Sequence, residues 1–122
     1  MPTILPMTLT ADPERLRDFY VAVLGAQAVE QTPPDDSGDP PFFLSLRLGD
    51  SVLGFIRESE PPAGNRTLLG IEVADVDALL DGVRAHGGAL TGGPTDMPWG
   101  MRVAHVRDPD GNPITLQCPT GN

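Results

Sequence analysis

The sequence has few cysteines, basic residues and aromatic residues, and it lacks long apolar runs. The only cysteine, Cys118, permits no intramolecular disulfide, and no run approaches the ~20 apolar residues that a membrane span needs. With 8 basic against 17 acidic side chains, the formal net charge is -9. Such a charge repels a phosphate backbone and favours a cationic small ligand. No signal peptide is recognisable, so we expect a soluble cytoplasmic protein with neither a nucleic-acid nor a membrane partner.

Familiar catalytic motifs are also missing. The chain has no GxSxG, CxxC, Walker-type or dinucleotide-binding motif, and Cys118 has no evident base near it in the sequence. A lone cysteine of this kind is typical of a small buried apolar group. The sequence therefore predicts no catalytic residue.

What the chain does have is an internal repeat. Residues 11–26 (ADPERLRDFYVAVLGA) return as residues 74–89 (ADVDALLDGVRAHGGA), an offset of 63 positions, which is 74 minus 11. Each copy has an aspartate as its second residue and a glycine just before its final alanine, which are helix start and stop signals. The chain is a tandem duplication, and the seam between two similar halves is a common place for a ligand.

Each half is predicted to contain a strand, a helix and three further strands. In the first half we expect strands at 3–10, 26–31, 42–48 and 51–57, a helix from Asp12 to Gly25, and a Pro-Asp loop at 32–41. In the second half we expect strands at 67–73, 89–91, 101–107 and 113–118, a helix at 75–86, and a Gly-Pro loop at 92–100. The predicted organisation is a first module at 1–57, a linker at 58–66 and a second module at 67–122, within one compact domain.

The order of elements and four motifs together carry a resemblance to a known family. The motifs are DFY at 18–20, LG at 24–25, PWGMR at 98–102 and DPDGNP at 108–113. On these residues, across nearly the whole chain, the sequence resembles the vicinal-oxygen-chelate superfamily of glyoxalase I, extradiol dioxygenases, fosfomycin-resistance enzymes and bleomycin-resistance proteins. The resemblance implies an α+β fold of two tandem βαβββ modules, whose curved antiparallel sheets form a cup with the helices outside. It also implies a homodimer.

Members of that family with metal chemistry carry His or Glu side chains that converge from strands of both halves. Carried over to this chain, those positions are occupied by Leu5 (or Met7), Leu68, Thr115 and a residue near Leu53, none of which is a competent ligand. His86 is predicted to end the second helix, which leaves Glu72 and His105 as the donors within strands. We therefore expect no metal and no cofactor.

The candidate ligand-binding residues are those expected to line the cup or its rim. Strand alternation places Leu53, Phe55 and Arg57 on one face, and one of Phe42 and Phe43 on the cup side. Trp99, in the Gly-Pro loop, is predicted to line the rim. The full set is Trp99, Phe42, Phe43, Phe55, Leu53, Arg57, Met101, Arg102, His105, Thr115, Gln117 and Glu72.

The leading hypothesis is non-catalytic binding of a small molecule, as in the bleomycin-resistance branch that this chain resembles through PWGxR and the missing metal ligands. The ligand would be a flat, aromatic and cationic natural product, such as a bleomycin-like glycopeptide, a mitomycin-like quinone or an aromatic-capped peptide, held by a homodimer for self-resistance. One alternative is a metal-dependent glyoxalase-like or dioxygenase-like lyase or isomerase with a displaced metal site. Another is an accessory interaction module with a vestigial cup.

Overall fold

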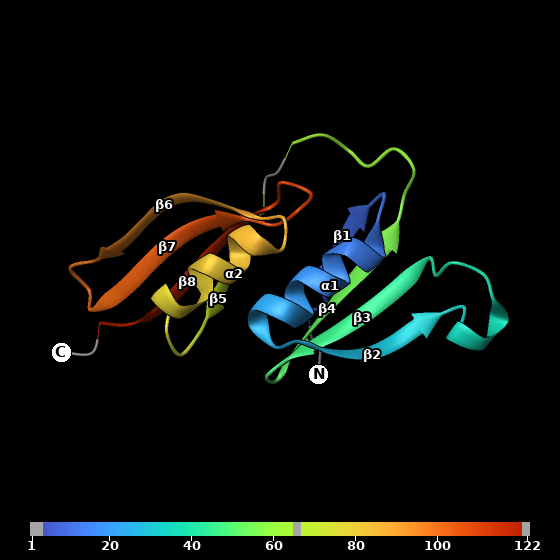
Figure 1. Cartoon of the computed structure of the whole chain (residues 1–122), viewed down its shortest axis with the longest axis horizontal. Coiled ribbons are helices and arrows are strands. Elements are labelled where there is room, and N and C mark those ends of the chain that lie inside the picture. Colours follow the sequence, from blue (N-terminus) through green and yellow to red (C-terminus); the bar gives the residue numbers. More distant parts are fainter. Residues whose placement is uncertain (1–3, 65–66, 121–122) are drawn as a thin grey trace. The chain divides into compact units, whose positions relative to one another are not determined.

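The computed structural model describes residues 4–64 and 67–120. The chain divides into two compact units, Met1–Ala63 and Gly64–Asn122 (Figure 1). No helix among the described residues is long and apolar enough to cross a membrane.

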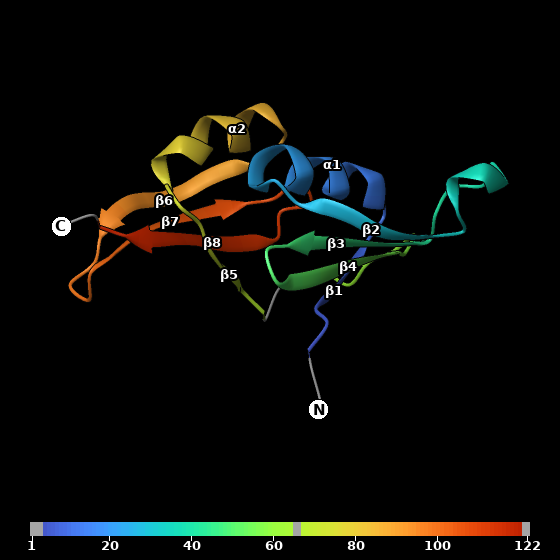
Figure 2. The same ribbon diagram turned by 90° about the horizontal axis from the view of Figure 1, so that it is seen from below.

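The first unit contains one four-stranded sheet with the strand order β1-β4-β3-β2. Strands β1 and β4 run parallel, and the other two pairings are antiparallel. Helix α1 packs on one face of this sheet (Figure 2). The elements are β1 (Met7–Thr10), α1 (Pro13–Leu24), β2 (Gln27–Thr32), the short 3-10 helix η1 (Asp35–Ser37), β3 (Phe43–Leu48) and β4 (Ser51–Arg57).

The second unit repeats this topology with the strand order β5-β8-β7-β6. The β5–β8 pair is parallel. A bulge between Leu90 and Gly92 interrupts the pairing of β6 with β7, and a bulge between Ala28 and Glu30 interrupts the pairing of β2 with β3 at the corresponding place. The elements are β5 (Leu69–Glu72), the 3-10 helix η2 (Asp77–Leu79), α2 (Leu80–Ala85), β6 (Ala89–Asp96), β7 (Met101–Arg107) and β8 (Pro113–Pro119). The predicted α+β fold of two tandem βαβββ modules is confirmed.

Helix α1 forms where the sequence predicts it. The carboxylate of Asp12 accepts a hydrogen bond from the N–H of Arg15 at 3.1 Å, and Pro13 occupies the first helical position. Gly25 ends the helix in the left-handed conformation, with φ 71°. One stripe of the helix is buried: Leu16, Phe19, Tyr20 and Val23.

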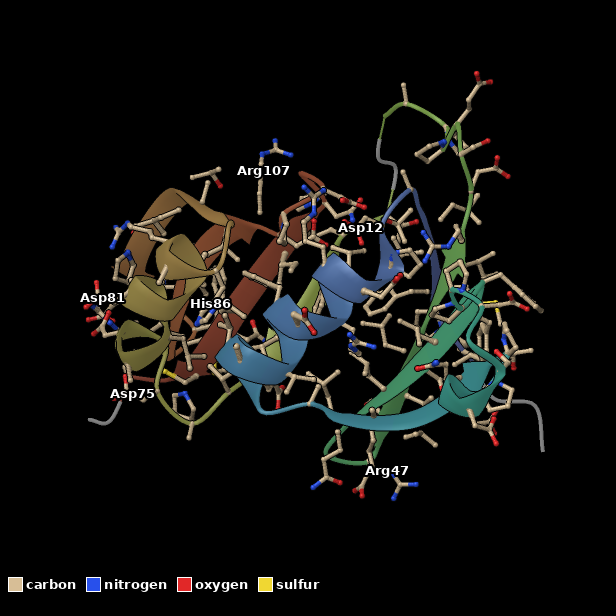
Figure 3. All side chains as sticks on the ribbon, turned by 45° about the vertical axis from the view of Figure 1, so that its right-hand side comes forward. Asp12, Arg47, Asp75, Asp81, His86 and Arg107 are labelled. Carbon is tan, nitrogen blue, oxygen red and sulfur yellow. The ribbon has the colours of Figure 1, made fainter. Side chains whose placement is uncertain are left out.

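The second helix is shorter than predicted. Instead of one helix over 75–86, the structure has the 3-10 turn η2 followed by six residues of α2. Asp75 still lies at the start of this segment (Figure 3), and its carboxylate accepts a hydrogen bond from the N–H of Ala78 at 3.4 Å. Gly82 within the segment and the glycine pair that follows His86 weaken an α-helix, which explains the shorter element. His86 ends α2 as predicted.

The prediction of a Gly-Pro loop at 92–100 is wrong for its first half, which belongs to a strand. Strand β6 continues to Asp96, because two register shifts in its pairing with β7 accommodate Gly92, Gly93 and Pro94. A proline is tolerated there because β6 is an edge of its sheet. The two hairpins are confirmed: β3 and β4 meet at Gly49 and Asp50, and β7 and β8 are joined across residues 108–112.

Each unit buries apolar side chains between its own helix and sheet. In the first unit these include Leu16, Phe19, Tyr20, Leu44, Leu46, Leu53 and Phe55, and in the second Val76, Val83, Ala104, Val106, Ile114 and Leu116. The turn between β7 and β8 is organised by the buried carboxylate of Asp108. Its Oδ1 accepts from the backbone N–H groups of Asp110 and Asn112, at 3.0 and 2.9 Å.

Two glycines with positive φ make a matched test of the bulge in β6. A methyl group on Gly93 (φ 78°) would lie 2.6 Å from the carbonyl oxygen of Val103, whereas one on Gly111 (φ 87°) meets nothing within 4 Å. Gly111→Ala should lower the free energy of unfolding by about 1 to 2 kcal/mol through backbone strain alone. Gly93→Ala should cost about 1 to 3 kcal/mol more, from the added clash. Urea unfolding measures both, and equal losses would contradict the bulge geometry.

Candidate functional site

Strand register decides which side chains α1 covers. Paired residues of neighbouring strands share a face, and β3 and β4 pair Leu44 with Phe55 and Leu46 with Leu53. All four side chains are buried beneath α1, and the ring centroids of Tyr20 and Phe55 are 5.5 Å apart. The prediction that Leu53 and Phe55 line the ligand-binding side is therefore wrong. The predicted position near Leu53 is one residue away from Gly54, and a shift of one residue reverses the face on which a strand's side chains lie.

Arg57 also lies on the helix side, where the structure gives it a different role. Its Nε donates to the carbonyl oxygen of Pro41 at 2.9 Å, Nη1 donates to that of Ala11 at 3.3 Å, and Nη2 pairs with Oε1 of Glu14. These bonds join β4 to the start of α1 and to the end of the loop before β3. Its partners are distant in the sequence, so the pattern along the chain gave no sign of them.

The face of the first sheet opposite α1 is the first candidate binding surface, which we call the first open face. Alternation and register assign to it a set of mostly apolar side chains on β1 and β4, and more polar ones on β2 and β3. The set is Met7, Leu9, Gln27, Glu30, Thr32, Phe43, Ser45, Arg47, Val52, Gly54 and Ile56. Arg47 lies at the hairpin end of β3 (Figure 3).

Phe43 is the aromatic centre of the first open face. A methyl group on Gly54 would lie 3.2 Å from Cε1 of Phe43 and 3.4 Å from Cγ of Met7, so both side chains rest over this glycine. Phe43 is half-buried, and Met7 and Leu9 are 50% and 42% exposed. The structure thus decides between the two phenylalanines. Phe43 faces the side opposite α1. Phe42 directly precedes β3, so the alternation of side chains turns it away from that side, and it is exposed.

Sequence reasoning missed Met7, Leu9, Gly54 and Ile56. No sequence motif identifies these four residues, because they come together only through the pairing of strands. The two-residue turn at Gly49 and Asp50 fixes the β3–β4 register, and the parallel pairing of β1 with β4 then brings Met7 beside Gly54 and Leu9 beside Ile56.

The face of the second sheet opposite η2 and α2 is the second candidate surface, which we call the second open face. It carries five of the predicted residues: Met101, His105, Thr115, Gln117 and Glu72. Val103 and the glycines Gly70 and Gly92 complete its central rows. Unlike the first open face, its central rows are largely polar.

His105 is held in one orientation on the second open face. Its Nδ1 lies 3.1 Å from the hydroxyl oxygen of Thr115, its registered partner on β8. On the other side, a methyl group on Gly92 would lie 3.4 Å from Cδ2 of the ring. The ring therefore lies across β7 between Thr115 and Gly92.

Arg102 lies on the helix side and not on the predicted ligand-binding side. Its Nε is 3.0 Å from Oδ2 of Asp77 in η2, and its Nη1 is 2.9 Å from Oδ1 of Asp96 in β6. The side-chain hydrogen bonds to Asp96 and then Asp77 raise the pKa of the Arg102 guanidinium above its ordinary value. Arg102 thus fastens the β6–β7 hairpin to η2.

Trp99 lies at the tip of the turn between β6 and β7 and is 66% exposed. The turn closes through the N–H of Gly100, which donates to the carbonyl oxygen of Met97 at 3.1 Å. The indole is outside the core, as the sequence predicted. Its contact with a ligand at a rim stays a prediction.

The residues present do not fit the metal site of the family's metal-dependent members. In the structure the position on β4 that matches Thr115 is Gly54 rather than Leu53, because Met7 pairs with Gly54 as Gly70 pairs with Thr115. Leucine, methionine and glycine side chains and one threonine hydroxyl are poor partners for a divalent ion. Among residues 4–64 and 67–120, no three His, Cys, Asp or Glu side chains are grouped to hold a metal.

Comparison with known proteins gives a match to one family model over residues 6–116, that of the Glyoxalase/Bleomycin resistance protein/Dioxygenase superfamily. A glyoxalase/bleomycin resistance protein/dioxygenase family enzyme from Burkholderia phytofirmans PsJN is similar in structure, with 24% identity, a TM-score of 0.76 and coverage of 93% of this chain and 94% of that one.

Two further solved structures share the fold. TioX from Micromonospora sp. ML1 is 22% identical, with a TM-score of 0.75 and coverage of 99% and 98%. The fosfomycin resistance protein FosX from Listeria monocytogenes, solved with Mn(II) and a sulfate ion, is 10% identical, with a TM-score of 0.76 and coverage of 98% of this chain and 91% of that one.

Neighbouring residues on β4 test which face α1 covers. Leu53→Ala should lower the free energy of unfolding by about 2 to 5 kcal/mol, because it leaves a cavity under α1. Val52→Ala, on the first open face, should cost less than about 1.5 kcal/mol, since the side chain is half-buried and water can fill its place. Chemical denaturation measures the pair, and a larger loss for Val52→Ala would reverse the assignment of faces.

Proposed function

The chain belongs to the Glyoxalase/Bleomycin resistance protein/Dioxygenase superfamily, and from that premise we propose that it is a non-catalytic binder of small molecules. The proposed ligand is a flat, aromatic natural product with cationic character, and the proposed role is sequestration of such a compound by a homodimer for resistance. The superfamily includes both resistance proteins and enzymes. The choice between them therefore depends on the side chains of this chain.

The observation that carries the proposal is the first open face. Phe43 lies over Gly54, and Met7, Leu9 and Ile56 surround it. Exposed apolar side chains grouped on one surface favour an interaction partner. A half-exposed phenyl ring among aliphatic groups offers a stacking surface, and a stacked ring pair contributes about 0.5 to 1.5 kcal/mol beyond the burial of apolar area.

The donor chemistry of the family's metal positions supports binding over metal-assisted catalysis. Leu5 or Met7, Gly54, Leu68 and Thr115 offer one hydroxyl between them. A metal-dependent enzyme of this family would need its metal held elsewhere, for which Glu72 and His105 are the candidate donors on the second open face. Stoichiometric Ni, Zn, Mn or Fe in the purified protein, lost in His105→Ala or Glu72→Ala, would support that alternative and contradict the proposal.

The direct experiment is a binding screen with three classes of compound: a bleomycin-like glycopeptide, a mitomycin-like quinone and an aromatic-capped peptide. Trp99, the only tryptophan, reports binding near its turn by fluorescence, and the melting temperature reports binding anywhere on the folded chain. We expect at least one class to raise the melting temperature in proportion to the logarithm of its concentration. If no class alters either signal, the proposal fails.

Adjacent phenylalanines provide a matched pair of variants for the stacking surface. Phe43→Ala should weaken binding of an aromatic ligand by about 1 to 3 kcal/mol, because it removes both the ring and its apolar area. Phe42→Ala removes the same atoms from an exposed residue of the opposite orientation and should leave binding nearly unchanged. Titration calorimetry measures both affinities. Equal losses would show that the first open face is not the binding surface.

Trp99 tests the predicted rim. Trp99→Ala should weaken binding by about 1 kcal/mol or more, since aromatic anchors dominate many binding sites. The melting temperature of the free protein should hardly change, because the indole is 66% exposed. A large fall in melting temperature with unchanged affinity would make Trp99 a structural residue instead.

A further inference from the structure

The first open face carries one acidic and one basic side chain that the stacking surface does not use. They are Glu30 on β2 and Arg47 on β3, and both are exposed. Within the part of the chain that the structure describes, neither side chain is engaged in an ion pair or a hydrogen bond. Two opposite charges are therefore available to a ligand on the face that also presents Phe43.

Register places both charges one step from Ser45. Glu30 is paired with Ser45 across β2 and β3, and its backbone N–H donates to the Ser45 hydroxyl at 3.2 Å. Phe43 and Arg47 lie two residues before and two residues after Ser45 on β3, so these side chains share one face. Ser45 is only 5% exposed although α1 packs on the other face of the sheet, so longer side chains around it lean over it. The two charges and the aromatic ring thus surround one small residue.

We propose that these groups form a site for the zwitterion of an aromatic α-amino acid. Glu30 binds the ammonium group, Arg47 binds the carboxylate and Phe43 packs against the ring. A carboxylate accepts the N–H donors of an ammonium, and the planar guanidinium binds a carboxylate through two parallel hydrogen bonds. This inference rests on the proposed function, which it deepens by naming the class of ligand: the ring is the flat aromatic part, and the ammonium supplies the cationic character.

The spacing of the three groups matches such a ligand. Glu30 and Arg47 are diagonal neighbours on adjacent strands, with Cα atoms roughly 7 to 8 Å apart. Phe43 and Arg47 are separated by roughly 14 Å along their strand, but the Phe43 ring shortens this gap because it leans over Gly54, in the row of Ser45. The ammonium and the carboxylate of an amino acid share one carbon atom, and the ring follows one carbon further. A ligand centred over Ser45 therefore reaches all three groups.

The pair of charges favours a zwitterion over an ion of either sign. An ammonium beside Glu30 also lies near Arg47, and a carboxylate beside Arg47 also lies near Glu30. A singly charged ligand therefore gains one attraction and meets one repulsion, whereas a zwitterion gains both attractions. The net charge of -9 further disfavours a ligand that carries only a carboxylate.

Arg47 can turn to a ligand without losing a partner. It lies at the hairpin end of β3 (Figure 3), and register places Gln27 and Val52 beside it on the neighbouring strands. Its aliphatic stem can rest along Val52 while the guanidinium stays in water. Arg57 and Arg102 differ, since carboxylates on the helix side already hold them. The arginine suited to an acidic group of a ligand is therefore Arg47.

The test uses four probes that share an indole ring: L-tryptophan, tryptamine, indole-3-propionate and 3-methylindole, each titrated into the full-length ¹⁵N-labelled chain. We expect tryptophan to bind about four- to twentyfold more tightly than 3-methylindole, because each of two exposed ion pairs contributes a factor of about two to five. Tryptamine and indole-3-propionate should differ from 3-methylindole by less than about twofold, because attraction and repulsion offset each other. Equal affinities for tryptophan and 3-methylindole would overturn the site.

Charge variants should reverse the ranking of the probes in opposite directions. Arg47→Gln leaves Glu30 alone and should make tryptamine the tightest probe, whereas Glu30→Gln leaves Arg47 alone and should make indole-3-propionate the tightest. Asp81→Asn and Arg84→Gln make the same charge changes at an exposed ion pair of α2 and should keep tryptophan first. The melting temperatures of the four variants should hardly change. If the α2 variants change the ranking as strongly, the effect is long-range and the site is wrong.

The same probes keep this inference distinct from the proposed function. Phe43→Ala should weaken all four probes by a common factor, because contact with the ring does not depend on charge. Binding of 3-methylindole that shifts the resonances of Phe43 and Met7, without a preference for tryptophan, would support the stacking surface and overturn the amino-acid site. No binding of any probe at millimolar concentration would also overturn this site, while the larger compounds of the binding screen decide the proposed function.

Discussion

The register of each β-hairpin determines which side chains of the two units are buried and which are exposed. A two-residue turn at Gly49 and Asp50 pairs Leu46 with Leu53, and this pairing sends one set of side chains beneath α1 and the other set to the opposite face. In the second unit, the turn organised by Asp108 pairs His105 with Thr115 and Ala104 with Leu116. A slip of one residue in either hairpin would exchange core and surface. The chemistry of each open face is thus a consequence of backbone pairing.

The duplicated fold gives two open faces with the same geometry and different chemistry. Where the first has Met7, Gly54 and Ser45 in one row, the second has Gly70, Thr115 and His105. The first row is largely apolar, and its glycine supports the Phe43 ring from the neighbouring row. The second is polar, and its histidine is oriented by a hydroxyl. Each open face therefore offers a different chemistry, although the two faces are built by the same topology.

Local signals were enough to predict the fold, and pairing between distant segments limited the prediction of the site. Asp12 and Gly25 bound α1, and the two hairpins appear where the turn residues predict them. The sequence could not show that β6 passes through Gly93 and Pro94 with a bulge, because that depends on tertiary pairing. Arg57 and Arg102 were predicted to bind the ligand. In the structure each forms an ion pair with a residue far away in the sequence, Arg57 with Glu14 and Arg102 with Asp77. Met7 and Gly54 belong to no motif and are brought together only by the parallel β1–β4 pair.

We propose that this member of the superfamily holds an aromatic ligand on its first open face and leaves it chemically unchanged. The most direct measurement is mass spectrometry of the tightest compound from the binding screen, recovered after it has co-eluted with the protein on size-exclusion chromatography. We expect co-elution at a fixed stoichiometry and a recovered compound of unchanged mass and unchanged chromatographic behaviour, however long the incubation. A product of altered mass, or an isomer formed at a rate proportional to protein concentration, would contradict it.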